Sequence, residues 1–357
     1  MPSITAAVLY GREDVRIESV PLSEPGPGEV RVRIAAALTC GTDVKVFRRG
    51  YHARMIQPPA VFGHEFAGVI DAVGAGVDAW KVGDRVVAAN SAPCNCCYYC
   101  RRGLWELCED LLFLNGAYSE SIVVPARIVD QNLCLVPETC SLQHAALSEP
   151  LACVVRGMDA VTIRPGNTVI VLGLGPIGLM FVRMCALSGA CTIAVGKRAD
   201  RLSAATELGA NVVLDISDYE NGLDLENAIL RETDEGRGAD TVIEAVGRPE
   251  AWEQAINLAR KGGTVSLFGG CPSDAIVRLN THRVHYDELT LLGTFHHTPH
   301  AFRRALSLIS SGAILAEKFI KRSESLLELP AILSALATGA EGAVKIAIIP
   351  PSHSGPA

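Results

Sequence analysis

Residues of the three types that bind zinc in proteins occur in the first half of the chain. Cys40 precedes a glycine, and His64 and Glu65 are consecutive. Thiolate, imidazole and carboxylate groups are zinc ligands, and a catalytic zinc takes three of them and keeps one coordination position open. Cys40 and His64 could supply two ligands, and the carboxylate could come from Glu65 or from Glu149. Each residue taken singly also fits an ordinary buried or surface position, but together with the two motifs described next the set predicts a catalytic zinc site.

A cysteine-rich segment at residues 94–108 predicts a second zinc site. Four cysteines follow one another with two, two and seven intervening residues, namely Cys94, Cys97, Cys100 and Cys108. This spacing lets one loop place four thiolates around a tetrahedral zinc, and such a closed site is structural because it leaves no position for substrate. The alternative is a set of unliganded thiols. Cys96, the surplus cysteine of the segment, is expected to be a free thiol.

A glycine motif in the second half of the chain predicts a dinucleotide site. An apolar run at residues 168–172 leads into Gly-x-Gly-x-x-Gly and then a helix-forming run, and the predicted cofactor contacts are Gly173, Gly175, Pro176, Ile177 and Gly178. Glycines there let the backbone approach a pyrophosphate that rests on the helix N-terminus. Strand-like and helix-like segments then alternate to about residue 294, which predicts a parallel sheet wound on both faces.

The residues after the second strand of that sheet indicate which cofactor is bound. An acidic residue at this position binds the ribose 2′-hydroxyl of NAD. Here the sequence reads Gly196-Lys197-Arg198, so the carboxylate is missing and two cations could hold a 2′-phosphate. We therefore expect NADP(H) to be favoured over NAD(H), the alternative being that Lys197 and Arg198 form a solvated turn.

Composition limits the other possibilities. The 357 residues predict about two domains, and 49% hydrophobic residues suffice for two cores. A net charge of −7 without runs of like charge argues against nucleic acid or an anionic membrane as a partner. The N-terminus lacks the basic region of a signal peptide, and we expect a cytoplasmic protein. Twelve cysteines in such a chain argue for metal ligation and buried thiols rather than disulfides.

The segment after Cys40 has two interpretations. Thr42 places a hydroxyl two residues from a predicted metal ligand, where it could pass on the substrate proton. It could also cap a helix predicted for residues 44–48, with Asp43 helping, because Ser, Thr and Asp are the usual N-cap residues. The two roles are compatible.

Taken together, the motifs resemble those of the zinc-dependent medium-chain dehydrogenases, in the polyol (sorbitol-like) and threonine dehydrogenase branch. The matching segments are Cys40-Gly41-Thr42-Asp43, Gly63-His64-Glu65, the cysteines of residues 94–108, Ser148-Glu149-Pro150-Leu151-Ala152, residues 173–178, Glu244-Ala245-Val246-Gly247 and Val344-Lys345-Ile346-Ala347. They extend over nearly the whole chain, and in combination they are highly specific.

The resemblance implies a fold and a set of ligands. A chaperonin-10-like, β-rich catalytic domain would be built from residues 1–155 and 295–357, and a doubly wound Rossmann domain would occupy residues 156–294. Cys40, His64 and Glu65 would approach the catalytic zinc, with Glu149 as fourth ligand or as a partner of the ligands. Two zinc ions per chain and a homodimer or homotetramer are also implied. Val246 and Thr294, near the ends of later strands, complete the predicted cofactor contacts.

The expected reaction is hydride transfer between a secondary alcohol, such as a polyol or sugar alcohol, and a nicotinamide cofactor. Zinc would act as the Lewis acid and Thr42 as the first proton carrier. The family often has a histidine five residues after the ligand cysteine, whereas this chain has Lys45, which either relays the proton or is simply exposed. His52, His296 and His297 are further pocket candidates. A zinc-free quinone or enone reductase and a non-catalytic NADP(H)-binding regulator are the competing hypotheses.

Overall fold

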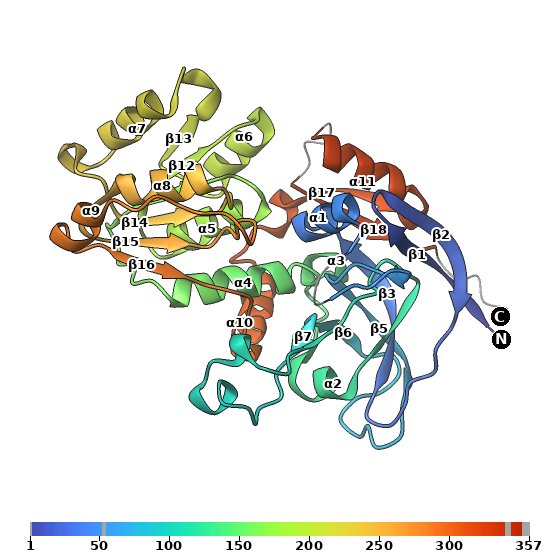
Figure 1. Cartoon of the computed structure of the whole chain (residues 1–357). Coiled ribbons are helices and arrows are strands. Elements are labelled where there is room, and N and C mark those ends of the chain that lie inside the picture. The colour runs from blue at the N-terminus through green and yellow to red at the C-terminus, as the bar shows by residue number, and fades with distance from the viewer. Residues whose placement is uncertain (1, 52–54, 340–343, 352–357) are drawn as a thin grey trace. The chain divides into compact units, whose positions relative to one another are not determined.

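The computed structural model describes residues 2–51, 55–339 and 344–351. The chain divides into two compact units, one made of Met1–Ala152 with His297–Ala357 and the other of Cys153–His296 (Figure 1). We call them the outer unit and the inserted unit. No helix within the described residues is long and apolar enough to cross a membrane.

The outer unit is built on β-sheets. Its strands are β1 (Ser3–Gly11), β2 (Asp14–Pro21), β3 (Val30–Leu38), β4 (Ala60–Val61), β5 (Phe66–Val73), β6 (Arg85–Ala88), β7 (Ser91–Ala92), β8 (Leu112–Phe113), β9 (Ser121–Val124), β10 (Leu133–Leu135), β17 (Ile320–Ser325) and β18 (Lys345–Ile349). The largest sheet has the order β10-β6-β5-β3-β18-β17, with β9 also paired to β3, and a second sheet has the order β2-β1-β4. Strand β18 therefore places the C-terminal segment beside the first half of the chain.

Alternation along β3 explains the core of this unit. Val30, Val32 and Ile34 are buried, whereas the arginines between them are not. Because successive side chains of a strand point to opposite faces, the apolar face of β3 packs into one core with Phe62 and Phe66. The helices that accompany these sheets are α1 (Gly41–Arg49), α2 (Ala126–Asn132), α3 (Leu142–Ala145), α10 (Pro299–Ser310) and α11 (Leu329–Thr338), and α4 (Ser148–Asp159) continues from this unit into the next.

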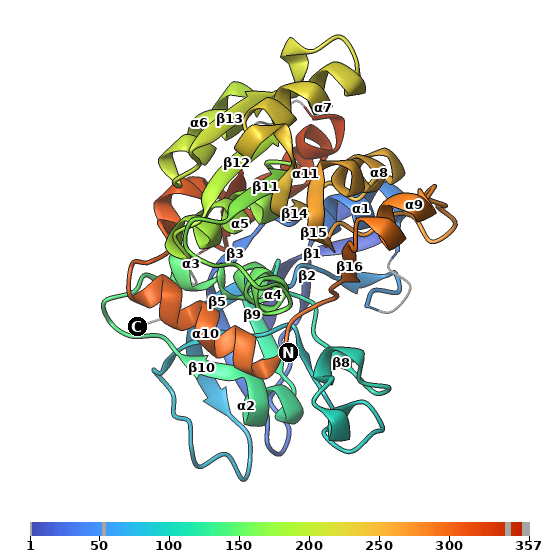
Figure 2. The same ribbon diagram turned by 90° about the vertical axis from the view of Figure 1, so that its left-hand side faces the viewer.

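The inserted unit contains the predicted parallel sheet. Its strands are β11 (Thr168–Leu172), β12 (Cys191–Gly196), β13 (Val212–Asp215), β14 (Ala239–Glu244), β15 (Ala259–Leu267) and β16 (Thr290–Gly293), in the order β13-β12-β11-β14-β15-β16. Its helices are α5 (Pro176–Leu187), α6 (Ala199–Glu207), α7 (Gly222–Arg231), α8 (Pro249–Leu258) and α9 (Thr281–Tyr286), and Figure 2 shows the sheet and its helices from the side. Every strand pair is parallel, which confirms the predicted doubly wound sheet.

Steric crowding explains why two positions of the fingerprint are glycines. Gly173 has a φ of +96°, and a Cβ there would lie 2.7 Å from Val246 Cγ2. A Cβ on Gly178 would lie 1.7 Å from the carbonyl oxygen of Gly173. A side chain at Gly178 would push α5 away from the end of β11, and a side chain at Gly173 would collide with the residues that follow β14.

The helix after Cys40 corrects one expectation. The structure has Cys40, not Thr42, as the N-cap of α1, with its sulfur accepting from the Thr42 backbone N–H at 3.4 Å. Asp43 completes the capping box by accepting from the Cys40 backbone N–H at 3.2 Å. The helix starts three residues earlier than predicted because a cysteine in extended conformation replaces the hydroxyl cap that the sequence rule anticipates.

Candidate active site and metal centres

Strand pairing brings the first predicted metal ligands together. Cys40 follows β3, His64 and Glu65 precede β5, and the two strands are antiparallel neighbours. The end of one strand therefore lies beside the start of the other, with the Leu38 backbone N–H donating to the Glu65 carbonyl at 2.9 Å. Ligand atoms of Cys40, His64 and Glu65 all lie within 4.8 Å of one another, so their donor set and spacing fit a zinc ion.

Asp43 and Tyr118 support His64, and the sequence analysis did not assign them to the site. Asp43 Oδ1 lies 3.2 Å from His64 Nδ1, and the Tyr118 hydroxyl donates to Asp43 Oδ2 at 2.6 Å. A carboxylate on one ring nitrogen orients the imidazole and leaves Nε2 for a metal. Burial disfavours the imidazolium, but Asp43 and Cys40 together outweigh it and raise the pKa of His64 well above its ordinary value. A metal would therefore have to displace a proton.

Lys345, from β18, forms an ion pair with Glu65 that the sequence analysis also missed. Its Nζ donates to Glu65 Oε1 at 2.8 Å, to Glu65 Oε2 at 2.5 Å and to the Thr39 carbonyl at 2.9 Å. Both side chains are almost fully buried, and burial raises the pKa of Glu65. Burial disfavours the ammonium, yet the Glu65 carboxylate raises the pKa of Lys345. The pairing of β18 with β3 places Lys345 beside Glu65. No local pattern in the sequence predicts this ion pair.

Glu149 lies in a neighbouring buried group. It is in the first turn of α4, with Oε1 3.8 Å from His297 Nε2, which in turn lies 3.0 Å from Asn90 Oδ1. Burial raises the pKa of Glu149 to about 7. Glu149 does not belong to the set of Cys40, His64 and Glu65 whose ligand atoms all lie within 4.8 Å. The structure therefore groups Glu149 with His297 instead of completing one four-residue set.

The other predicted residues of this region have different environments. Thr42 is half-buried in the first turn of α1, and Lys45 is exposed one turn further on. His296 is the last residue of the inserted unit. His52 lies outside the described residues.

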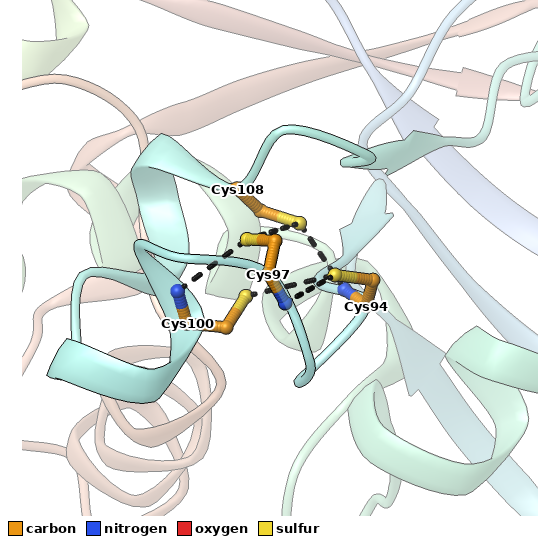
Figure 3. Close-up of side chains that lie close together, drawn as sticks. All are labelled: Cys94, Cys97, Cys100 and Cys108. Atoms are coloured by element: carbon orange, nitrogen blue, oxygen red, sulfur yellow. Dashed lines mark hydrogen bonds between the residues drawn. The ribbon is translucent and has the colours of Figure 1, made fainter.

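The four spaced cysteines converge as Figure 3 shows. All four sulfurs lie within 4.8 Å of one another, with 4.0 Å from Cys94 to Cys100 and 4.0 Å from Cys97 to Cys108. Thiolates about 2.3 Å from a tetrahedral zinc are about 3.8 Å apart, so the cage fits that ion. Backbone N–H groups of Cys96 and Cys97 lower the pKa of Cys94 to about 6, which favours the thiolate that a metal needs.

The inserted unit has a cleft of about 820 Å³ at the carboxyl ends of its strands. The predicted cofactor residues that line it are Gly173, Gly175, Gly196, Lys197 and Val246. Those that do not are Pro176, Ile177, Gly178, Arg198 and Thr294. Glu244 holds one wall, since its Oε1 accepts from the backbone N–H groups of Val246 and Gly247 at 2.7 Å each. Ligands of open α/β sheets bind at this edge.

Arg201 is a cleft residue that the sequence analysis missed. It is one turn into α6, lines the cleft and is half-buried. Its Nε is buried without a hydrogen-bond partner among the described residues. Burial and the nearby Arg198 lower the pKa of Arg201. An anionic ligand would relieve both effects, because it would neutralise the two cations and accept the free N–H.

Comparisons with known proteins decide the family. Residues 26–136 match the alcohol dehydrogenase GroES-like domain, and residues 176–311 match the zinc-binding dehydrogenase family. The chain is 30% identical to sorbitol dehydrogenase of Bacillus subtilis over 331 residues, which cover 91% of each protein. It is 33% identical to L-threonine 3-dehydrogenase of Pyrococcus horikoshii over 320 residues, 87% of each. The chain belongs to the zinc-dependent medium-chain alcohol dehydrogenases. It lies in their polyol branch, as its motifs predicted.

A solved structure supports the same fold. The chain has a TM-score of 0.89 and 32% identity to a putative zinc-binding dehydrogenase of Sinorhizobium meliloti bound to NADP, covering 98% of this chain and 100% of that one. The predicted fold class, a GroES-like domain with a Rossmann domain, is thereby confirmed. This medium-chain dehydrogenase is an enzyme that acts on alcohols with zinc and a nicotinamide cofactor.

Proposed function

We propose that this dehydrogenase interconverts a secondary alcohol, of the polyol or sugar alcohol class, and its ketone, with NADP(H) favoured over NAD(H). We propose one catalytic zinc at Cys40, His64 and Glu65, with Glu149 as fourth ligand or partner, and one structural zinc at the four spaced cysteines. Relatives named sorbitol dehydrogenase and xylulose reductase support the substrate class. A homodimer or homotetramer is proposed from the family alone.

The two bound groups would divide the chemistry. Zinc supplies Lewis acidity and the nicotinamide accepts or returns hydride. The chain's residues would hold and orient these groups: Asp43 and Tyr118 fix the His64 ring, and Lys345 holds Glu65. Thr42 would accept the proton of the substrate hydroxyl and pass it outward. Gly173 and Gly175 would receive the pyrophosphate.

One structural observation supports the cofactor preference: Arg201 Nε, in the cleft, is buried without a hydrogen-bond partner among the described residues. Arg201 lines the cleft together with Lys197, and no carboxylate follows β12 where NAD enzymes carry one. A 2′-phosphate would give Arg201 the acceptor that it lacks. We expect Arg201→Ala to lower kcat/KM for NADP by about 10- to 100-fold, the worth of a hydrogen bond between charged groups, and to leave kcat/KM for NAD nearly unchanged.

Steady-state kinetics with both cofactors measure this effect. Arg231→Gln is a matched control, because Arg231 is an exposed arginine of α7 that does not line the cleft. Its two kcat/KM values should equal those of the wild type. A wild type that prefers NAD, or an Arg201→Ala variant that loses both cofactors equally, would contradict the NADP proposal.

The substrate class is tested by initial rates. Polyols, sugar alcohols and simple secondary alcohols are offered with NADP, and the matching ketones with NADPH. We expect the highest kcat/KM among vicinal polyols. A chain that oxidises only simple monohydric alcohols would contradict the polyol part of the proposal.

Lys45 gives a separate prediction about proton release. Lys45 is exposed, so its amino group can reach water, and Thr42 lies three residues before it in the same helix. If it relays the proton, Lys45→Met should shift the pH profile of kcat to higher pH, because the acceptor is lost. The control Arg49→Met changes another exposed cation of α1. A profile identical to that of the wild type would show that the proton leaves through water.

A further inference from the structure

Cys96 lies beside the proposed structural zinc site without belonging to it. Of the twelve cysteines, all within the described residues, only Cys96 is exposed. Its Sγ lies 3.6 Å from Cys94 Sγ. That separation is shorter than the 4.0 Å between Cys94 and Cys100, yet Cys96 is outside the set of four sulfurs that lie within 4.8 Å of one another.

The backbone between the two cysteines explains this approach. Asn95 has a φ of +60°, a left-handed conformation that residues other than glycine seldom adopt. In an extended strand the side chains of residues i and i+2 lie on the same face, separated by the rise of two residues. The bend at Asn95 brings the Cys94 and Cys96 sulfurs closer together than that. Arg101 also donates to the Cys96 carbonyl, which holds the backbone of the turn. A contact between Cys94 and Cys96 is thus built into the loop.

We propose that Cys96 is an oxidation site at which peroxide converts the zinc-binding loop into a disulfide-bonded, zinc-free form. Hydrogen peroxide first oxidises the exposed Cys96 thiol: the O–O and S–H bonds break, an S–O bond forms, and one water leaves. The Cys94 sulfur then attacks the Cys96 sulfur, forms the S–S bond and displaces hydroxide, which takes a proton to become the second water. Two thiols are oxidised, and one peroxide is reduced to two waters.

The geometry allows the second step with little movement. A disulfide needs the sulfurs about 2.05 Å apart, so they must close by about 1.5 Å. The exposed side chain of Cys96 can rotate, whereas Cys100 and Cys108 are buried. Once Cys94 is in a disulfide, only three of the four thiolates remain, and a closed tetrahedral site loses the ligand set that retains zinc. A thiol reductant with added zinc would reverse the change.

The experiment uses the full-length chain as isolated with zinc. It is treated with a small excess of hydrogen peroxide, zinc release is followed with a chromophoric indicator, and disulfides are mapped by mass spectrometry without reduction. We expect a Cys94–Cys96 disulfide and a fast release of one zinc per chain. Cys96→Ser should slow that release by about tenfold or more, because the neighbouring thiol is lost as an internal reactant. Cys271→Ser, a control in the inserted unit, should match the wild type.

Equal release rates in wild type and Cys96→Ser overturn the proposal, and so does a disulfide that forms between other cysteines of the loop. The inference rests on the proposed structural zinc but on no proposed substrate or cofactor preference. Zinc content before peroxide is added tests that zinc separately. If the loop holds none, the disulfide map alone decides whether Cys94 and Cys96 pair.

Discussion

Cys40→Ala is expected to lower kcat/KM for alcohol oxidation by roughly a thousandfold or more and to remove one zinc per chain. The proposed catalytic site has three close donors, Cys40, His64 and Glu65. Removing the thiolate leaves the His64 imidazole and the Glu65 carboxylate, which is already paired with Lys345. Lewis acidity contributes several kcal/mol to such reactions, and each 1.36 kcal/mol is about tenfold in rate. Steady-state kinetics and metal analysis by mass spectrometry measure the two effects.

Cys140→Ala is the matched control for this variant. Cys140 is a buried cysteine of the same unit, and its sulfur donates to the Ser141 carbonyl at 3.5 Å. It should keep the activity and both zinc ions. Retention of full zinc and near-wild-type kinetics by Cys40→Ala would remove the basis of the catalytic-zinc proposal.

Lys345→Met should destabilise the protein by about 3–5 kcal/mol, the cost of leaving one member of a buried ion pair without its partner. Lys345 and Glu65 are 2% and 0% exposed, so water cannot reach the orphaned carboxylate. The Thr39 carbonyl would also lose its donor. Urea denaturation followed by fluorescence and circular dichroism measures the free energy of unfolding.

Two further variants separate charge from packing at this position. Lys321→Met changes an exposed lysine on the neighbouring strand β17 and should alter stability by less than about 0.5 kcal/mol. Lys345→Met combined with Glu65→Gln removes both charges and should regain about half of the lost stability. If the double variant is no more stable than Lys345→Met, the loss comes from packing and not from the unpaired carboxylate.

The sequence predicted those motifs whose residues lie close together in the chain. The spacing of Cys94, Cys97, Cys100 and Cys108 lies within one loop, so a short stretch of chain determines whether four sulfurs can meet. The glycine fingerprint is local in the same way, because strand, turn and helix N-terminus are consecutive in sequence. The start of α1 was predicted three residues late, because cysteine is not among the residues that helix-capping rules favour.

Sequence patterns could not predict side-chain contacts between residues that lie far apart in the sequence. Lys345 is 280 residues from Glu65, and Tyr118 is 75 from Asp43, so only the pairing of β18 with β3 and the folding of the loop that carries Tyr118 bring them together. Arg201 follows the cofactor-selecting position by one helical turn, and only the path of α6 shows that it lines the cleft.

The sequence by itself determined the family and the dinucleotide motif, and it predicted two sets of metal ligands from residue types and motifs. Tertiary structure alone decided which buried charges neutralise one another around those sets. It paired Glu65 with Lys345, placed Asp43 against His64 and set Glu149 beside His297. The physical reason is that a buried charge needs a partner within a few ångströms, and the chain can supply that partner from any strand that the fold brings near.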